Sequence, residues 1–400
     1  YYNVYFMVML LLFYGDFMTI YIKSNFLYGE NFELKKGILV IEDNIIKGFT
    51  NENIKNFINY DGIIIPPLIN AHTHIGDNVI KDIGINKTLD ELVKPPDGLK
   101  HKFLNSCDDK TLIYGMLDGM YELYNNGINY FCDFRENGLK GINLFKKSYR
   151  ELLSSQEQTK ILPPNPIILG RPTKTDKIEL KQEIKEILKN SNGIGLSGCN
   201  EYSDSKLKFI RKETTGIFSI HANEHKGSVE YSKKHHKKTE IERIIDLNLN
   251  PNFIIHATHS ESHEINLLNE YNIPVVVCPR ANSSFNIGLP NIVELLKSNI
   301  LIGLGTDNFM ANSPSIFKEM DFIYKLYHIE PKEILKFATI NNAKILGLNN
   351  VGLIKEGFKP DFTFIRPNSI NIKYSKNIVA SIITRCEMGN IDNFNFKYRI

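Results

Sequence analysis

The spacing of hydrophobic positions changes near residue 65. Between Met18 and Ile65, β-rich pieces such as TIYIKSNFLY and KKGILVIEDNIIKGF alternate with turn residues, and no helical period is present. This pattern predicts a small β unit. From Pro66 onward, short apolar runs are separated by longer stretches with helical spacing, which predicts repeated β/α units and a parallel sheet.

Eight apolar runs follow one another in this second region, and each is short enough for one buried strand. They cover residues 67–72, 128–134, 166–170, 193–198, 217–221, 253–257, 273–278 and 300–307. Eight parallel strands indicate a closed (β/α)8 barrel of the TIM type rather than an open sheet. The predicted fold class is therefore α/β.

The end of the chain is expected to rejoin the first β unit. A last helix is predicted from residue 331, after which residues 351–365 and 377–390 both show β-type patterning. We therefore expect a small β-sandwich domain built from both termini. The expected bounds are 18–65 plus 356–400 for this composite β domain and 66–355 for the barrel.

The first 17 residues are interpreted separately. Their apolar stretch, Phe6 to Tyr14, is too short to span a bilayer. It also lacks the positively charged start and the small-residue cleavage site of a secretory signal. Because a natural first strand begins at Met18, residues 1–17 are expected to be a non-native or upstream extension.

Composition and charge narrow the class of protein. With 42% hydrophobic and 23% charged residues among 400, the chain is expected to fold as a globular protein. A net charge of +3 gives no sign of nucleic-acid or membrane binding. Five widely spaced cysteines without a CxxC pair fit a reducing compartment. We expect a cytoplasmic protein that binds a small-molecule substrate, with assembly into a homo-oligomer left open.

The candidate chemistry lies where the predicted strands end. The first strand ends in His72 and His74, and alternation along a strand places both imidazoles on one side. His221, His256 and Asp307 end the fifth, sixth and eighth strands. Since barrel enzymes carry catalytic groups at the carboxyl ends of their strands, these five side chains are expected to converge.

Five segments of the chain resemble the signature segments of the amidohydrolase superfamily, in the branch that contains cytosine, guanine and adenosyl-type deaminases. They are IIPPLINAHTH, HANE, IIHATH, VVVCPRAN and IGLGTDN. The resemblance covers about residues 18–395, and it departs at Pro67, where the family usually has Gly.

The resemblance implies a role for each matching residue. His72, His74, His221 and Asp307 would be metal ligands, Glu224 the proton shuttle, and His256 a hydrogen-bond partner of the attacking water. Three imidazoles and one carboxylate suit one divalent ion, Zn²⁺ or alternatively Fe²⁺. Some amidohydrolases hold two metals through a lysine that ends the fourth strand. Because GIGLSGCNEY has no lysine, a single ion is favoured.

Two other zinc-enzyme patterns fit less well. His221, Glu224 and His225 match the H-x-x-E-H pattern of metalloproteases, but that pattern requires a helix and these residues follow a predicted strand. The cytidine-deaminase fold needs H-x-E with P-C-x-x-C, and neither is present.

Substrate contacts are predicted from the other strand ends. Several cations there suggest an anionic or carbonyl-bearing substrate, although Arg135 could instead pair with Asp133 or Glu136 for structure. The candidate contacts are Arg135, Arg171, Glu201, Arg280, Asn282 and Asn308. The long segment after the first strand is expected to form a lid or pocket wall, with Asp77, Lys81 and Lys100 facing substrate.

The predicted activity is hydrolysis of a C–N bond other than a peptide bond. Deamination of a nucleobase-like or nucleoside ring by metal-activated water is the leading version. A cyclic amide hydrolase similar to imidazolonepropionase is the alternative within the same class. A non-catalytic scaffold on this fold is the alternative of another class, and such proteins have usually lost metal ligands that this chain retains.

Overall fold

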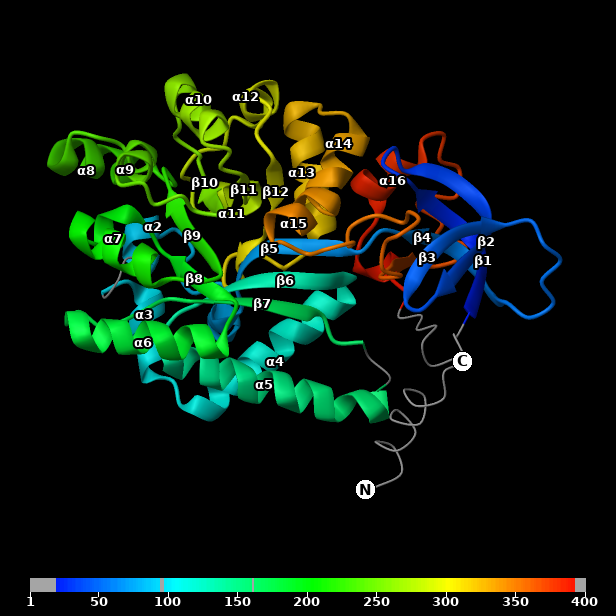
Figure 1. Cartoon of the computed structure of the whole chain (residues 1–400), viewed down its shortest axis with the longest axis horizontal. Coiled ribbons are helices and arrows are strands. Elements are labelled where there is room, and N and C mark those ends of the chain that lie inside the picture. Colours follow the sequence, from blue (N-terminus) through cyan, green and yellow to red (C-terminus); the bar gives the residue numbers. More distant parts are fainter. Residues whose placement is uncertain (1–18, 94–96, 160–161, 393–400) are drawn as a thin grey trace.

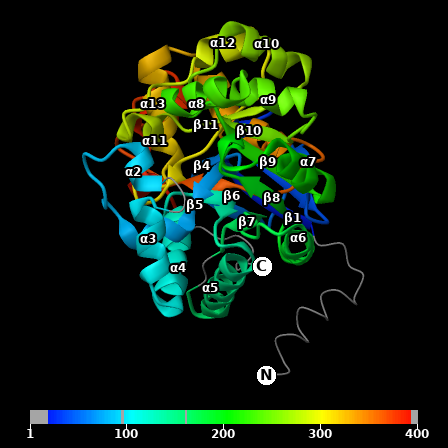
Figure 2. The same ribbon diagram turned by 90° about the vertical axis from the view of Figure 1, so that its left-hand side faces the viewer.

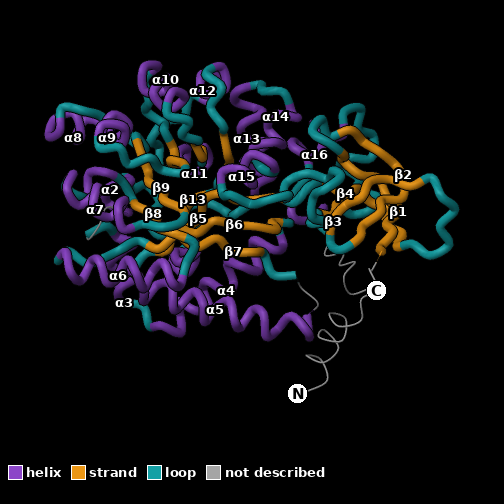
Figure 3. Tube along the Cα trace, in the orientation of Figure 1, coloured by secondary structure: helices purple, strands orange, loops and turns teal. Residues whose placement is uncertain are grey.

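The computed structural model describes residues 19–93, 97–159 and 162–392. Two sheets organise this part of the chain. One curls into a barrel covered by helices, and the other forms a small β domain at the end of the barrel away from α7 and α8 (Figures 1 and 3). The predicted extension, residues 1–17, lies outside the described residues.

The barrel is built from parallel strands taken in sequence order. They are β5 (Leu68–His74), β6 (Ile128–Arg135), β7 (Asn165–Gly170), β8 (Gly193–Leu196), β9 (Ile217–Ala222), β10 (Phe253–His256), β11 (Val275–Val277), β12 (Ile302–Leu304) and β13 (Asp307–Asn308). The last two are pieces of one eighth strand, which first pairs with β11 and then with β5. Its second piece closes the barrel by placing Asp307 opposite Thr73 of β5, and the predicted (β/α)8 fold is confirmed.

These strands form because their residues can be buried on both faces. Every residue of β5 is buried, and so is every residue of β8, β10 and β11. Such continuous apolar runs are typical of parallel strands covered by helices. Figure 2 shows the strands in the centre with the helices arranged around them. The buried imidazoles of β5 are therefore exceptions in an apolar core.

The outer helices connect successive strands or follow the last strand of the barrel. They are α4 (Asp109–Asn125), α5 (Gly138–Thr159), α6 (Lys177–Asn190), α7 (Asp204–Glu213), α8 (Lys226–His236), α9 (Glu240–Asp246), α10 (Ser262–Glu270), α11 (Pro279–Ser284), α12 (Ile292–Lys297), α13 (Ile316–Tyr327), α14 (Pro331–Phe337) and α15 (Ile340–Ile345). Side-chain caps start several of them. Thr239 closes a capping box with Glu242 at α9, and Asp176 accepts two backbone N–H groups at α6.

A covering segment lies between β5 and α4. It consists of the 3₁₀ helix η1 (Ile75–Ile80) and the short helices α2 (Leu89–Val93) and α3 (Leu99–Ser106). Within this segment, η1 directly follows the first barrel strand. Both α3 and the barrel helix α4 contact η1. A second 3₁₀ turn, η2 (Cys199–Glu201), follows β8.

The small β domain joins both ends of the described chain. Its strands are β1 (Thr19–Tyr28), β2 (Glu33–Glu42), β3 (Ile45–Thr50), β4 (Ile58–Ile65) and β14 (Thr363–Ile365), in the sheet order β14-β4-β1-β2-β3. An isolated antiparallel bridge between Ile365 of β14 and Ile391 connects the end of the described chain to this sheet. Ile22, Phe26 and Leu39 are among the side chains of its separate apolar core. The prediction that a small β domain combines the two ends is confirmed.

One predicted strand is a helix. Residues 378–385, which carry a β-branched apolar run, form α16 (Ile378–Arg385), capped where the side chain of Asn377 accepts from the N–H of Ala380. Val379, Ile382 and Ile383 are spaced for one helical face, and α16 packs against α13 and α14. Tertiary burial against these two helices therefore outweighs the strand preference of the β-branched residues. A 3₁₀ turn, η3 (Met388–Asn390), follows.

None of the helices in the described ranges combines the length and the apolar character needed to cross a membrane.

Candidate metal centre

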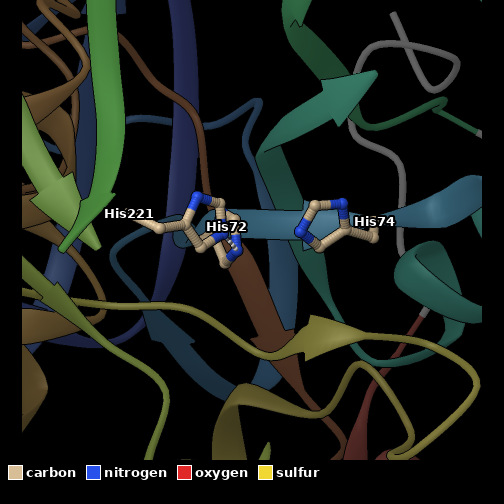
Figure 4. A group of neighbouring side chains, drawn as sticks. All are labelled: His72, His74 and His221. Carbon is tan, nitrogen blue, oxygen red and sulfur yellow. Dashed lines mark hydrogen bonds between the residues drawn. The ribbon is translucent and has the colours of Figure 1, made fainter. Parts of the chain in front are cut away.

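The side chains predicted from the strand ends meet at the carboxyl end of the barrel. His72 and His74 project from β5, His221 from β9, and Asp307 from β13. Figure 4 shows the ring of His221 beside that of His72, with His74 one step further along β5. Burial is nearly complete for all four residues, which the structure brings into one cluster.

The spacing of the four donor groups fits one shared ion. Nε2 of His72 lies 3.2 Å from Nε2 of His221 and 3.3 Å from Oδ1 of Asp307, which is itself 3.5 Å from Nε2 of His74. Tetrahedral zinc with bonds of ~2.0–2.1 Å requires donor atoms roughly 3.3 Å apart. The donor set and its spacing therefore fit a divalent ion.

Hydrogen bonds on the far side of two rings aim their Nε2 atoms at the cluster. Nδ1 of His221 lies 2.8 Å from the carbonyl oxygen of Leu196, to which it donates. Nδ1 of His74 lies 3.0 Å from Oε1 of Glu136 and donates a hydrogen bond to this carboxylate. With the proton fixed on Nδ1, Nε2 of each ring offers a lone pair, as metal-binding histidines require.

The electrostatics of the cluster also suit a cation. Burial lowers the pKa of His72 to about 3 and holds that of His221 well below its usual value, so both rings are neutral ligands. Burial by itself would raise the pKa of Asp307, but the hydrogen bond and charge of His72, with help from His256 and His74, bring it below its usual range. Asp307 is therefore a carboxylate.

Glu224 and His256 lie beside the four donors. Oε1 of Glu224 is 3.5 Å from Nε2 of His256, which lies 4.0 Å from Oδ2 of Asp307. Burial raises the pKa of Glu224 well above its usual value, and the charges of Asp307 and other acids add to this effect. A buried carboxyl group that keeps its proton at neutral pH can act as a general acid. Burial lowers the pKa of His256 to about 4, so this ring is neutral.

The turn that carries Glu224 is clamped by two buried acids. Asn223 has a left-handed backbone with φ of 49°. Its N–H donates to Glu240 over 2.9 Å, and its side-chain amide donates to Glu264 over 2.7 Å. Asn223 lies in the short stretch between His221 and Glu224. Its hydrogen bonds therefore fix the backbone from which these two side chains project.

The three arginines predicted at the mouth have different surroundings. Arg135 is buried and pairs with Glu136 and, at 3.3 Å, with Asp133. This pairing is the structural alternative considered from the sequence, and it is favoured over substrate binding. Arg280 contacts Glu319 at 3.3 Å and the carbonyl oxygen of Ser313 at 3.2 Å.

Arg171 follows β7 and is half-buried. Among the described residues, its guanidinium has no hydrogen-bonding or ion-pairing partner. It is therefore the predicted mouth arginine that stays available to a ligand.

The other predicted substrate contacts vary in exposure. Glu201 is exposed and accepts a hydrogen bond from Ser197. Asn282 is buried and donates to Thr258 over 2.6 Å. Asn308 is buried in β13, opposite His74 of β5. Their roles toward substrate stay predictions.

Two lysines of the covering segment form ion pairs within the protein, and the role of the segment as a lid or pocket wall stays a prediction. Lys81 is half-exposed and pairs with Glu122 at 2.8 Å. Lys100 is almost fully buried and pairs with Asp77 at 3.0 Å and with Glu136 at 2.6 Å. Sequence reasoning missed the contact of Glu136 with His74. The signal in the sequence was that Glu136 directly follows β6, the strand that pairs with β5, which carries His74.

The chain is similar to known proteins over most of its length. A sequence model described as the amidohydrolase family matches residues 63–391. An uncharacterised protein of Methanocaldococcus jannaschii is 58% identical, over 94% of this chain and 97% of its own. The 5-methylthioadenosine/S-adenosylhomocysteine deaminase of Thermococcus sibiricus is 27% identical, over 94% and 92%.

Two solved structures share the fold. Guanine deaminase from C. acetobutylicum, with bound guanine, has a TM-score of 0.75 at 19% identity, covering 94% of this chain and 97% of its own. An adenosine deaminase from Xanthomonas campestris, with bound zinc, has a TM-score of 0.72 at 14% identity, covering 93% and 90%.

Proposed function

Because this chain belongs to the amidohydrolase family, we propose that it hydrolyses a C–N bond other than a peptide bond by deaminating a nucleobase-like or nucleoside ring. His72, His74, His221 and Asp307 would hold one divalent ion, with zinc favoured over iron. One observation carries the deaminase version. Glu224, a carboxyl group whose pKa is raised by burial, lies beside His256 at the edge of the donor cluster, where an acid can reach a ring nitrogen.

The ion and the side chains have separate tasks. When bound, a divalent ion lowers the pKa of a water molecule to about 7, which makes a nucleophile available at neutral pH. Asp307, a carboxylate, accepts the proton that this water gives up. His256 is neutral and lies between Glu224 and Asp307, so it can hydrogen-bond the attacking oxygen and orient it.

Glu224 balances the charge on the substrate. As the new C–O bond forms at the amidine carbon, Glu224 delivers its proton to the adjacent ring nitrogen. Asp307 then passes its proton to the amino group, the C–N bond breaks, and ammonia leaves. The remaining hydroxyl proton returns to Glu224, which restores the enzyme. General acid catalysis of this kind contributes ~10²–10⁴ in rate.

The substrate class follows from the relatives and from one free cation. The 27% identical protein of Thermococcus sibiricus is named a deaminase of 5-methylthioadenosine and S-adenosylhomocysteine, which supports a 6-aminopurine ring. Within the part of the chain that the structure describes, the guanidinium of Arg171 has no ion-pairing partner. We infer that it contacts an anionic or carbonyl group that the ring carries.

Ammonia release tests this proposal. The zinc-loaded protein is assayed with purine nucleosides, free purines, pyrimidines and pterins, and with imidazolonepropionate as the cyclic amide. Glu224→Gln serves as the matched inactive variant. Ammonia from an aminopurine or another amino-substituted ring supports deamination. Ring opening of the cyclic amide without ammonia would favour the alternative hydrolase, and no turnover of any compound by a zinc-loaded protein would favour the non-catalytic scaffold.

A further inference from the structure

A buried group of charged side chains lies behind the metal centre and plays no part in the proposed reaction. Its acids are Asp77, Asp133 and Glu136, and its cations are Lys100 and Arg135. All five are buried. Burying a charged side chain costs free energy unless the charge is paired. A buried group of five ionisable side chains therefore calls for a functional explanation.

Glu136 is the member that touches the centre. Its Oε1 lies 3.0 Å from Nδ1 of His74 and 2.6 Å from Nζ of Lys100, while its Oε2 contacts Arg135. One carboxylate thus accepts from the imidazole and is fixed on its other sides by two cations. A carboxylate on the outer nitrogen of a ligand histidine sets the orientation of the ring.

Lys100 comes from the covering segment and not from the barrel. It lies in the first turn of α3, and its amine also lies 3.0 Å from Oδ2 of Asp77 in η1. The other oxygen of Asp77 accepts from the N–H of Met310, three residues after Asp307. The chain of contacts therefore runs from His74 through Glu136 and Lys100 to the loop that follows Asp307.

The balance of charge in the group suits a neighbouring cation. It contains three acidic and two basic side chains, so acidic groups outnumber basic ones behind His74. Asp133 also supports the backbone around His74, since its Oδ1 accepts from the N–H of Ile75 over 2.7 Å and from the hydroxyl of Thr73. The group thus holds both the ring and the main chain of this ligand.

We propose that Lys100 is a positioning residue of the metal centre. From α3 it fixes the Glu136 carboxylate against Nδ1 of His74, and it thereby couples metal binding to the docking of the covering segment. The inference rests on the metal centre of the proposed function and extends it to a residue that touches neither the ion nor the reacting atoms.

Zinc affinity tests this role without knowledge of the substrate. Dissociation constants are measured by chelator competition for the wild type, Lys100→Met and Glu136→Gln. Both variants are expected to bind zinc about tenfold or more weakly, as is usual when the support of a ligand histidine is lost. Lys81→Met is the matched control, because Lys81 belongs to the same segment but pairs with Glu122 at the surface, and its zinc affinity is expected to be unchanged.

A second measurement separates positioning from a merely structural role. The visible spectrum of the cobalt-loaded protein is expected to change in Lys100→Met and Glu136→Gln but not in Lys81→Met. If Lys100→Met fails to fold because Asp77 is left unpaired, the double variant Asp77→Asn/Lys100→Met removes both charges and takes its place.

The outcomes distinguish this inference from the proposed function. Wild-type zinc affinity with an unchanged cobalt spectrum in Lys100→Met, or in the double variant, would overturn the positioning role alone. A wild-type protein that binds no zinc or cobalt would overturn the metal centre, and the proposed function with it.

Discussion

Oε1 of Glu224 lies 3.5 Å from Nε2 of His256, although the two residues follow different strands of the barrel. The contact is possible because β9 and β10 are parallel neighbours whose ends are in register, with Ala222 opposite His256. The side chain of His256 is buried and that of Glu224 is only 18% exposed, so little water surrounds the pair to weaken their interaction. An acid and a neutral imidazole thus face the same small space beside Asp307.

Replacing Glu224 by Gln is expected to lower kcat by at least ~10² while the bound metal is unchanged. The amide keeps the shape of the side chain but has no proton to transfer. The measurement is kcat together with metal content by elemental analysis. Glu230→Gln, in the exposed part of α8, is the control and is expected to keep wild-type turnover. Near-normal turnover of Glu224→Gln would show that another group supplies the proton.

Metal content is expected to be about one zinc or iron ion per chain, because the two groups of possible ligands share His72 and therefore lie at one site. Chelation is expected to abolish activity, and added zinc to restore it. His74→Ala removes one donor and is expected to lower metal occupancy, whereas His263→Ala, which affects a half-exposed ring on α10, is expected to leave it unchanged. A firm value of two ions per chain, or none, would contradict the single-ion centre.

The left-handed turn at Asn223 gives a prediction for stability. Asn223→Ala places an ordinary side chain at φ of 49°, which costs about 1–2 kcal/mol, and it also removes the amide that bonds Glu264. Asn223→Gly loses the same bond but tolerates the backbone, so it is expected to be the more stable of the two variants in urea unfolding of the metal-free protein.

Asn248 provides the matched pair for this measurement. It has φ of 52° on an exposed position, and its side chain has no hydrogen-bond partner among the described residues. Asn248→Ala and Asn248→Gly therefore report the backbone effect by itself. If Asn223→Gly were as stable as the wild type, the clamp by Glu264 would contribute nothing to the turn.

The buried carboxyl of Glu319 gives a pH-dependent prediction. Burial raises its pKa to about 8, despite the pairing with Arg280. Between about pH 4.5 and 8, the folded protein keeps this proton while the unfolded chain releases it, so the free energy of unfolding falls as the pH rises. Glu319→Gln cannot titrate. Its stability relative to the wild type is expected to increase by up to about 1.4 kcal/mol per pH unit across this window.

Urea unfolding at pH 5, 6, 7 and 8 measures this difference. The other titrating groups are common to both proteins and cancel in the comparison. A stability difference that stayed constant with pH, or that changed in favour of the wild type, would show that Glu319 is ionised in the folded protein throughout this range.

The order of strands and the identity of the clustered donors could be predicted from the sequence. Apolar runs that can be buried on both faces are a local property, and so is the alternation that places His72 and His74 on one side of a strand. Once eight parallel strands close into a barrel, their ends must meet. His221, His256 and Asp307 were found in this way, because each is the last or nearly the last residue of its apolar run.

Tertiary structure decided everything that depends on which groups share one buried space. Residues 378–385 carry a strand-like run, yet they form a helix because α13 and α14 offer a surface that a helical apolar face can cover. The mouth arginines look alike in sequence, but buried acids pair with Arg135 and Arg280, whereas Arg171 has no ion-pair partner in residues 19–93, 97–159 and 162–392.

Lys100 shows the physical reason most clearly. Its position in the chain, in a segment of turns and short helices, gives no sign that its amine lies beside a carboxylate that supports His74. The spacing of hydrophobic residues predicts which face of a helix or strand is buried. It does not record which charges meet there, because the pairing of a buried charge depends on distances between elements that only the folded chain sets.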